Sequence, residues 1–214
     1  MSMIASVLHL DRQAVKALRI TDLYSLHRVV YSLYEDVRSD AEKQASKASG
    51  ILFADQGGDF SGKRILLLAN RAPAAYIDGQ YGQVLSKAIP PDFLRHQHYR
   101  FSVIVNPTRR DSASRKLVPV KGREAIGQWF CERAISSWGF EVAPAQLQVD
   151  RVEVLQFNDK LQNPVTLAQA RLQGQLRVTD PLQLHKSFTQ GIGRARTFGC
   201  GLLQLVPLLD NPFA

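Results

Sequence analysis

The C-terminal third of the chain constrains the fold most, because its strand, helix and loop signals follow one another without a gap. Residues 166–178 alternate apolar side chains with Gln and Arg, a period of two that is typical of a strand with one buried face. Asp180 and Pro181 then predict the start of a helix, and Gly191 predicts its end. Residues 202–206 predict a further, buried strand. The last loop of the chain therefore runs from a helix into a strand.

That loop is the glycine-rich run GIGRARTFGCG, residues 191–201. Its glycines permit positive φ and close approach of another molecule, and its arginines offer charge to a phosphate. The order helix, loop, strand excludes a dinucleotide fingerprint, and the run lacks the GK[ST] ending of a P-loop. A mobile turn without a ligand is the alternative, but a turn rarely needs four glycines and two arginines. The candidate binding residues are Gly191, Gly193, Arg194, Arg196, Gly199 and Gly201.

Positive charge is concentrated in one stretch. Residues 94–123 hold eight basic residues and one acidic residue, so they carry +7 of the formal net charge of +8. Such clustering is typical of nucleic-acid binding, and a solvated surface fits less well because carboxylates are nearly missing. Residues 100–105 and 117–120 predict two strands around a turn-rich excursion, in the manner of a hairpin. The basic residues expected to contact nucleic acid here are Arg109, Arg110, Arg115, Lys116 and Lys121.

The remaining signals predict the pattern βαββαβ twice. In the first half we expect strands at 3–10, 51–54 and 64–69, a helix from Thr21 or Asp22 to about Arg38, a short helix at 81–87 and an edge segment ending near Pro90–Pro91. In the second half we expect a helix at 122–137 and a strand at 146–157 whose apolar phase slips near Arg151, as at a β-bulge. The sequence thus predicts an α+β fold of two tandem ferredoxin-like domains, residues 1–96 and 97–214, with a basic β-hairpin and a C-terminal glycine-rich loop.

Composition excludes several classes of protein. The longest apolar runs are far too short to cross a membrane, and the N-terminus lacks the basic region of a signal peptide. Cys131 and Cys200 form no CxxC pair, and His96 and His98 are interpreted as surface residues and not as metal ligands. We therefore expect a cytoplasmic protein with no membrane contact, disulfide, metal or cofactor.

One histidine lies beside a core-facing stripe of the first helix. Tyr24, His27 and Tyr31 fall on one strip along the border of the apolar face, so an imidazole and a phenol can address one substrate atom. Histidine transfers protons in either direction near neutral pH, because its usual pKa is about 6.5. Packing at the edge of a core is the alternative, and the helix alone does not identify a site. The apolar stripe comprises Leu23, Leu26, Val30, Leu33 and Val37.

Three segments together resemble the CasE family, the CRISPR RNA-processing endoribonucleases of type I-E systems. They are GIGRARTFGCGLLQLVPL, the helix TDLYSLHRVVYSL and the hairpin VIVNPTRRDSASRKLVPVKG. The resemblance implies two ferredoxin-like domains and a metal-independent endoribonuclease without a cofactor. Such an enzyme binds the hairpin of CRISPR repeat transcripts and cleaves 3′ of the stem, where the 2′-hydroxyl attacks the adjacent phosphate and leaves a 2′,3′-cyclic phosphate.

The resemblance also implies roles for individual residues. His27 corresponds to the catalytic histidine, for which we favour the role of general base, and Tyr24 to its partner, which orients by hydrogen bonding. Arg194 and Arg196 are the first candidates for the cation that stabilises the phosphorane, with Lys116 or Lys121 as alternatives. The implied partners are the repeat RNA hairpin and the backbone subunit of the Cascade complex, with a monomer outside that complex.

Two other functions compete with this interpretation. A non-catalytic RNA-binding subunit of a CRISPR ribonucleoprotein would keep the glycine-rich loop without a working histidine. A small-molecule enzyme or regulatory domain would leave the basic excursion at residues 106–123 without a purpose.

Overall fold

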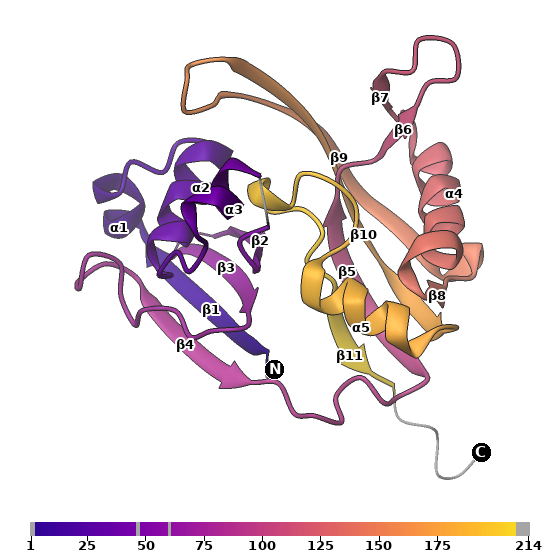
Figure 1. The fold of residues 1–214 in the computed structure, drawn as a ribbon, viewed down its shortest axis with the longest axis horizontal. Helices are drawn as coiled ribbons and strands as arrows, with labels where there is room; N and C mark the ends of the chain where they lie inside the picture. The colour runs from indigo at the N-terminus through magenta and orange to yellow at the C-terminus, as the bar shows by residue number, and fades with distance from the viewer. Residues whose placement is uncertain (1–2, 46–47, 60, 209–214) are drawn as a thin grey trace. The chain divides into compact units, whose positions relative to one another are not determined.

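The computed structural model describes residues 3–45, 48–59 and 61–208. The chain forms two compact units (Figure 1). The first comprises Met1–Pro90 with Thr197–Gly199, and the second comprises Pro91–Arg196 with Cys200–Ala214. Three residues of the glycine-rich run thus belong to the first unit, although the rest of the run belongs to the second. The division falls between Pro90 and Pro91, whereas the sequence predicted a boundary after residue 96.

The first unit is built on a four-stranded antiparallel sheet in the order β2-β3-β1-β4. This is the ferredoxin-like arrangement, in which the first and third strands lie at the centre. In the central pair, Leu8 stands opposite Ile65, and both are fully buried. The strands are β1 (Ile4–Asp11), β2 (Ile51–Gly58), β3 (Gly62–Ala69) and β4 (Gln83–Ala88).

The core of this unit lies between one face of the sheet and helix α2. The helices are α1 (Arg12–Ala17), α2 (Leu23–Ser32) and α3 (Asp40–Gln44). Leu26, Val29 and Val30 of α2 are buried in one apolar cluster with Leu8 and Phe53 of the sheet. Among the helices of the described residues, none is long and apolar enough to cross a membrane.

Helix α2 is shorter than the sequence predicts. It begins after Asp22 as expected, but it ends at Ser32, with Leu33 as the C-cap. Asp36 accepts hydrogen bonds from the backbone and side chain of Arg38, and such local bonds compete with helix formation. Val37 is 64% exposed, so its assignment to the core-facing stripe was wrong.

The short helix expected at residues 81–87 is instead strand β4. Gly82 adopts φ +61°, and a Cβ there would lie 2.9 Å from the side chain of Leu8. The segment pairs with the edge of β1, where Val84 stands opposite Leu8. Pairing with an open sheet edge therefore outweighs the weak helical signal.

The second unit repeats the ferredoxin-like order. Its sheet runs β11-β5-β10-β8, and β9 also pairs with β10. Arg171 of β10 stands opposite Arg151, and Leu172 stands opposite Val149, so Asp150 is an extra residue in β9. The phase slip predicted near Arg151 is therefore a β-bulge. The strands are β5 (His98–Val105), β8 (Phe140–Glu141), β9 (Leu147–Asn158), β10 (Pro164–Val178) and β11 (Gln204–Pro207).

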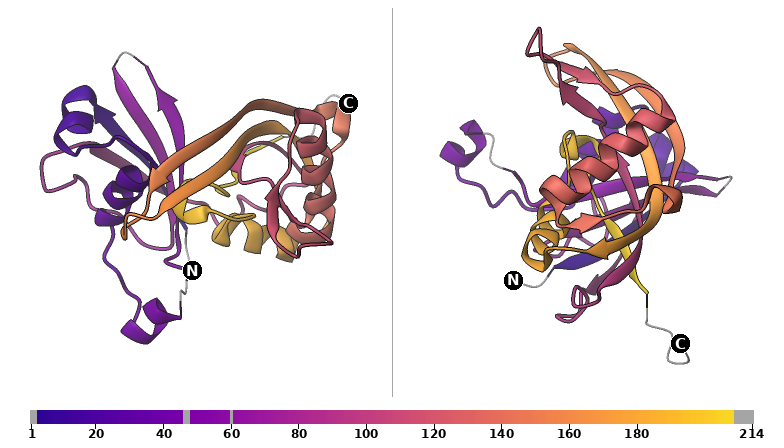
Figure 2. Two further views of the ribbon diagram at one scale, coloured as in Figure 1. Left: turned by 90° about the horizontal axis from the view of Figure 1, so that it is seen from above. Right: turned by 90° about the vertical axis from the view of Figure 1, so that its right-hand side faces the viewer.

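Aromatic packing fixes a helix on one face of this sheet. Helix α4 (Arg123–Arg133) continues into a π-helical turn (Ala134–Trp138), and α5 (Pro181–Gln190) follows β10. Phe130 of α4 stacks on Phe101 of β5 with ring centroids 5.5 Å apart. Figure 2 shows α4 lying across the sheet. The caps of α5 are those predicted, with Asp180 accepting from Leu182 and Gln183.

The last strand differs in extent from the expected 202–206. It begins at Gln204 and ends at Pro207. Leu202 and Leu203 are buried before the strand starts, whereas Val206 is 60% exposed. The apolar run therefore combines a buried loop end with a strand that has one outward face.

Replacement of Phe130 by Ala should destabilise the protein by about 3–5 kcal/mol, because the ring is fully buried and its removal leaves a cavity. Denaturant unfolding followed by circular dichroism measures the change. Ile135→Ala is the matched control, since Ile135 is exposed on the adjoining turn and should change stability by less than about 0.5 kcal/mol. Equal effects of the two substitutions would contradict the packing described.

Candidate functional site

Helix α2 carries His27 in a row of aromatic side chains. Asp22 caps the helix by accepting from the Ser25 backbone at 2.7 Å, and Ser25 Oγ accepts from the Asp22 backbone at 2.9 Å. This reciprocal capping box fixes the first turn. Tyr24, His27 and Tyr31 then follow at spacings of three and four residues, on one strip of the helix as predicted.

Three rings surround the imidazole of His27 within the first unit. The Tyr31 ring lies nearest, with centroids 4.0 Å apart, and the Tyr24 ring lies 6.1 Å away. The ring of Phe198 meets the imidazole edge-on at 5.9 Å. Phe198 lies far from α2 in sequence, so the tail of the glycine-rich run completes the surroundings of this histidine.

Burial lowers the pKa of His27 below its usual value of 6.5, and a hydrogen bond with the Thr197 backbone opposes that shift. Nδ1 of the ring is buried and has no hydrogen-bond partner among the described residues. At neutral pH the imidazole is therefore mainly uncharged. An uncharged imidazole is able to accept a proton from a substrate.

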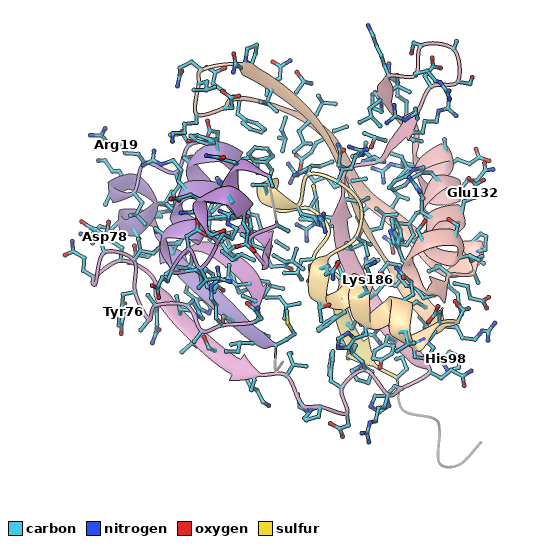
Figure 3. The ribbon with its side chains drawn as sticks, in the orientation of Figure 1. Arg19, Tyr76, Asp78, His98, Glu132 and Lys186 are labelled. Carbon is cyan, nitrogen blue, oxygen red and sulfur yellow. The ribbon has the colours of Figure 1, made fainter. Side chains whose placement is uncertain are left out.

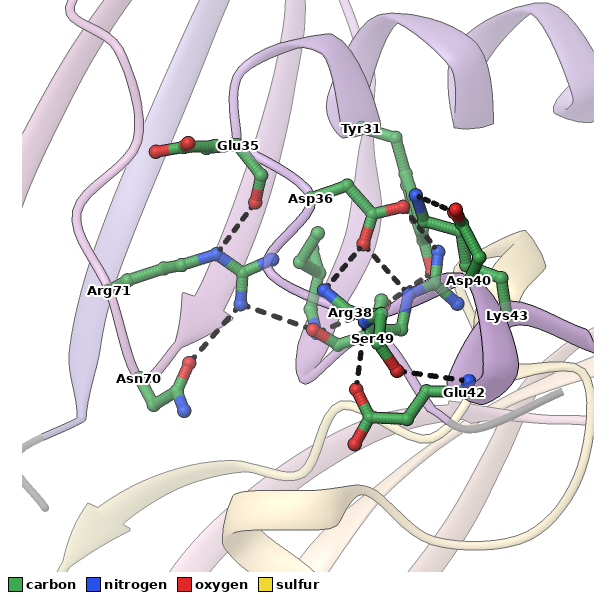
Figure 4. Close-up of polar contacts among 12 residues, drawn as sticks. Tyr31, Glu35, Asp36, Arg38, Asp40, Glu42, Lys43, Ser49, Asn70 and Arg71 are labelled. Atoms are coloured by element: carbon green, nitrogen blue, oxygen red, sulfur yellow. Dashed lines mark hydrogen bonds and ion pairs between the residues drawn. The ribbon is translucent and has the colours of Figure 1, made fainter. Parts of the chain in front are cut away.

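Tyr31, the ring nearest to His27, is anchored by a polar network with Ser49 and Arg71 (Figure 4). Ser49 Oγ donates to the Tyr31 hydroxyl at 2.9 Å, and Arg71 Nη1 donates to the Ser49 carbonyl at 3.1 Å. Arg71 Nε also donates to the Glu35 carbonyl, and its guanidinium lies over the Tyr34 ring at 5.5 Å. Burial raises the pKa of Tyr34 to about 12, so this phenol stays protonated. Nothing in the sequence signals this network, because its members come from separate elements.

Within the second unit, one hydrogen bond joins the two ends of the glycine-rich run, and a second ties the run to β5. The Ile192 amide donates to the Gly201 carbonyl at 2.9 Å, and the Gly201 amide donates to the Ile104 carbonyl at 2.7 Å. Gly201 adopts φ +83°, and a Cβ there would lie 2.3 Å from the Ile192 carbonyl oxygen. Only glycine fits that position. Gly191 and Gly193 also adopt positive φ.

Gly199 serves the first unit instead. It adopts φ +80°, and a Cβ would lie 3.0 Å from the ring of Phe53 in β2. The close approach of the backbone to Phe53 is what allows Thr197 and Phe198 to reach His27. The glycines of the run therefore have two tasks, loop closure at Gly201 and docking of the tail at Gly199.

The two arginines of the run differ in availability. Arg194 is exposed. Arg196 is half-buried and donates from Nη1 to the Gln190 carbonyl at 2.7 Å. One peptide bond separates Arg196 from Thr197, whose backbone meets His27.

Cys200, near the end of the run, is buried and reached by Gln169 Nε2 at 3.4 Å. Burial raises the pKa of this thiol to about 12, which makes it a poor nucleophile.

The basic excursion forms a hairpin of β6 (Thr108–Arg110) and β7 (Leu117–Pro119). The arm expected at residues 117–120 therefore pairs within the excursion and not with the strand predicted at residues 100–105, which lies in β5 between β10 and β11. Its tip is ordered by Asp111, which accepts from the backbone and hydroxyl of Ser114, and by Arg110, which donates to the Arg115 carbonyl. Its base is anchored by Trp129 Nε1, which donates to the Thr108 carbonyl. All five predicted cations are exposed: Arg109, Arg110, Arg115, Lys116 and Lys121.

In the described part of the chain, no group of three or more His, Cys, Asp and Glu side chains is arranged to hold a metal ion. The metal-free route expected from the sequence stays a prediction.

The fold is shared with known proteins. The family model of CRISPR-associated proteins matches residues 3–207. Thermus thermophilus Cse3, solved with an RNA that represents a pre-cleavage complex, superposes with a TM-score of 0.78 at 21% identity, covering 97% of this chain and all of the other. Cas6e from Escherichia coli K-12 gives 0.61 at 21% identity, with coverage of 96% and 100%.

A chain of a CRISPR RNA-guided surveillance complex gives a TM-score of 0.69 at 17% identity, with coverage of 96% and 100%. No significant sequence match to a curated protein was found. The likenesses confirm the tandem ferredoxin-like fold that the sequence predicts.

The surroundings of His27 predict its titration. The imidazole should titrate below pH 6.5, and Phe198→Ala should move the pKa upward, because removal of that ring exposes the imidazole. NMR of the imidazole carbon-bound protons against pH measures both. A pKa at or above 6.5 in the unsubstituted protein would contradict the burial described.

Proposed function

Because the chain belongs to the family of CRISPR-associated proteins, whose model spans nearly all of it, we propose that it binds and processes CRISPR repeat RNA. The similar structures Cse3 and Cas6e are CasE proteins, and Cse3 was solved bound to RNA as an endoribonuclease. The finer proposal is cleavage on the 3′ side of the repeat stem without a metal. The observation that carries it is the imidazole of His27, half-buried among the rings of Tyr24, Tyr31 and Phe198.

Cleavage requires a base, a proton for the leaving oxygen and positive charge for the phosphorane. In our assignment His27 accepts the proton of the ribose 2′-hydroxyl, and the 2′-oxygen forms a bond to the adjacent phosphorus. The bond from phosphorus to the 5′-oxygen breaks, and that oxygen takes a proton from water. The products are a 2′,3′-cyclic phosphate and a 5′-hydroxyl. The lowered pKa of His27 supports the base assignment, since the proton-accepting form prevails at neutral pH.

Tyr24 is assigned to orientation, as a hydrogen-bond donor beside the imidazole. For the cation, exposed Arg194 is favoured over Arg196, whose guanidinium already donates to a carbonyl. Guanidinium stays protonated and so serves charge stabilisation and not proton transfer. Lys116 and Lys121 remain the alternatives.

Recognition of the stem is assigned to the basic hairpin. A-form RNA hides its base edges in a deep, narrow groove, so proteins read its shape and backbone. Arg109, Arg110, Arg115 and Lys116 are exposed on an ordered hairpin, which suits phosphate contacts. We also propose that the protein keeps its product and joins a surveillance complex through the backbone subunit, since a chain of such a complex shares this fold.

His27→Ala should lower the rate of repeat RNA cleavage about a hundredfold to ten-thousandfold while leaving RNA affinity unchanged, because the proton acceptor is removed. Single-turnover cleavage with EDTA present, with analysis for the cyclic phosphate, measures this. His9→Ala is the matched control, since His9 is exposed on β1 and lies outside the aromatic row. RNA binding without a cyclic-phosphate product in the unsubstituted protein would instead support the non-catalytic subunit.

The reversal Arg109→Glu with Arg110→Glu should weaken binding of the repeat hairpin and reduce the steepness of its salt dependence by about two phosphate contacts. Fluorescence anisotropy across a salt series measures the slope. The charge-matched control reverses Arg133 and Lys160, which are exposed elsewhere in the second unit. An unchanged slope in the hairpin variant would refute the assignment.

A further inference from the structure

The sheet of the second unit presents one face away from α4. Tyr99, Phe101, Val103 and Val105 of β5 are fully or almost fully buried, and Phe101 packs on Phe130 of that helix. The alternate residues of β5 point to the opposite face, because strand side chains alternate. We call this opposite side the open face, although Ile104, at the end of β5 that the Gly201 amide contacts, is itself buried. Cross-strand pairing defines its rows: Ile104, Arg171 and Arg151; Gln204, Ser102, Gln173 and Gln148; Val206, Arg100 and Gln175; His98, Arg177 and Glu141.

The chemistry of the open face is unusual for a solvated sheet. Its central row is made entirely of amides and one hydroxyl, and the next row carries an arginine flanked by a valine and an amide. Side chains two residues apart on one strand repeat about every 6.6 Å, so the arginines and amides form a regular grid of donors. Guanidinium binds phosphate through two parallel hydrogen bonds, and an amide serves both as donor and acceptor for a ribose 2′-hydroxyl.

Carboxylates stand only at the margins of these rows among the described residues. Glu141 pairs with Arg177 at 2.7 Å, and Glu153, just beyond Arg171 and Arg151, pairs with Arg151 at 2.8 Å. Arg100 lies between these margins and is exposed, as are Gln173, Gln175 and Gln148. His98, labelled in Figure 3, is the first residue of β5 and belongs to the last of these rows, opposite Arg177. The centre of the open face is therefore positive.

We propose that the open face binds a single-stranded stretch of RNA next to the repeat stem by its sugar–phosphate backbone. The inference rests on the proposed function, because it names a second part of the same substrate. The rows contain no Phe, Tyr or Trp on which bases could stack, so the contacts are to phosphate and ribose, which carry no sequence information directly. The flat spacing of the grid suits an extended strand, whereas the basic hairpin is free to hold the duplex.

The test compares two non-cleavable RNAs with a 2′-deoxy nucleotide at the cut site. One is the repeat hairpin with unpaired ten-uridine tracts on both sides of the stem, and the other is the same hairpin without tracts. Arg100→Glu should weaken binding of the extended RNA about tenfold and change binding of the bare hairpin less than twofold. The salt slope for the extended RNA should fall by about 0.7 for each phosphate that the variant no longer neutralises.

Arg133→Glu on α4 is the charge-matched control and should not distinguish the two RNAs. Equal decreases in affinity for both RNAs with Arg100→Glu, or equal effects of the two variants, would overturn the proposal. So would an extended RNA that binds no tighter than the bare hairpin, which would leave the face to an acidic protein partner. If the unsubstituted protein does not bind the bare hairpin, the proposed function itself fails. That result differs from every result above, each of which presupposes binding of the hairpin.

In a second measurement, 4-thiouridine placed in the tracts should cross-link to peptides of β5 and β10 and not to α4. Cross-links confined to α4 would contradict the assignment even where affinities agree.

Discussion

The proton transfer that we propose depends on an imidazole, His27, that is partly withdrawn from water. The rings of Tyr31, Tyr24 and Phe198 exclude solvent from His27, and the resulting decrease in hydration favours its uncharged form. Each ring is fixed by a different device: the capping box of α2, the hydroxyl pair of Ser49 and Tyr31, and the backbone fit of Gly199 on Phe53. Loss of any one of these contacts would let water reach the imidazole and raise the pKa of His27.

The arrangement also explains why the glycine-rich run is divided between the units. Its first part is closed by main-chain bonds around Ile192 and Gly201, while Thr197–Gly199 packs with the first unit. Chain continuity therefore links the cation candidates of the run with the surroundings of His27. The hairpin that carries the other basic residues is fixed separately: Trp129 bonds to the Thr108 carbonyl at its base, and Asp111 bonds to the Ser114 backbone at its tip. The proton transfer and the duplex recognition that we propose would thus rest on different structural supports.

Much of the fold follows from local patterns in the sequence. The alternation in β10, the caps of α5 and the phase slip in β9 each arise from neighbouring residues, and each is present in the structure. The errors occur where other contacts decide the outcome. Residues 81–87 become a strand because β1 offers a free edge, and α2 stops at Ser32 because local side-chain bonds around Asp36 and Arg38 compete with the helix. In the site, Tyr24 and His27 are visible as a helical spacing, whereas Ser49, Arg71 and Phe198 join them only through tertiary contacts.

The bulge in β9 changes the bend of the strand without changing which side chains lie on each face of the sheet. Asp150 is an additional residue between Val149, which faces α4, and Arg151, which lies on the opposite side. A bulge bends its strand and increases the local twist. Removal of Asp150 by a single-codon deletion would restore an uninterrupted ladder and leave every flanking side chain on its present side. Length variation at this one position would thus change the bend of the strand while conserving which flanking side chains face α4 and which face the opposite side.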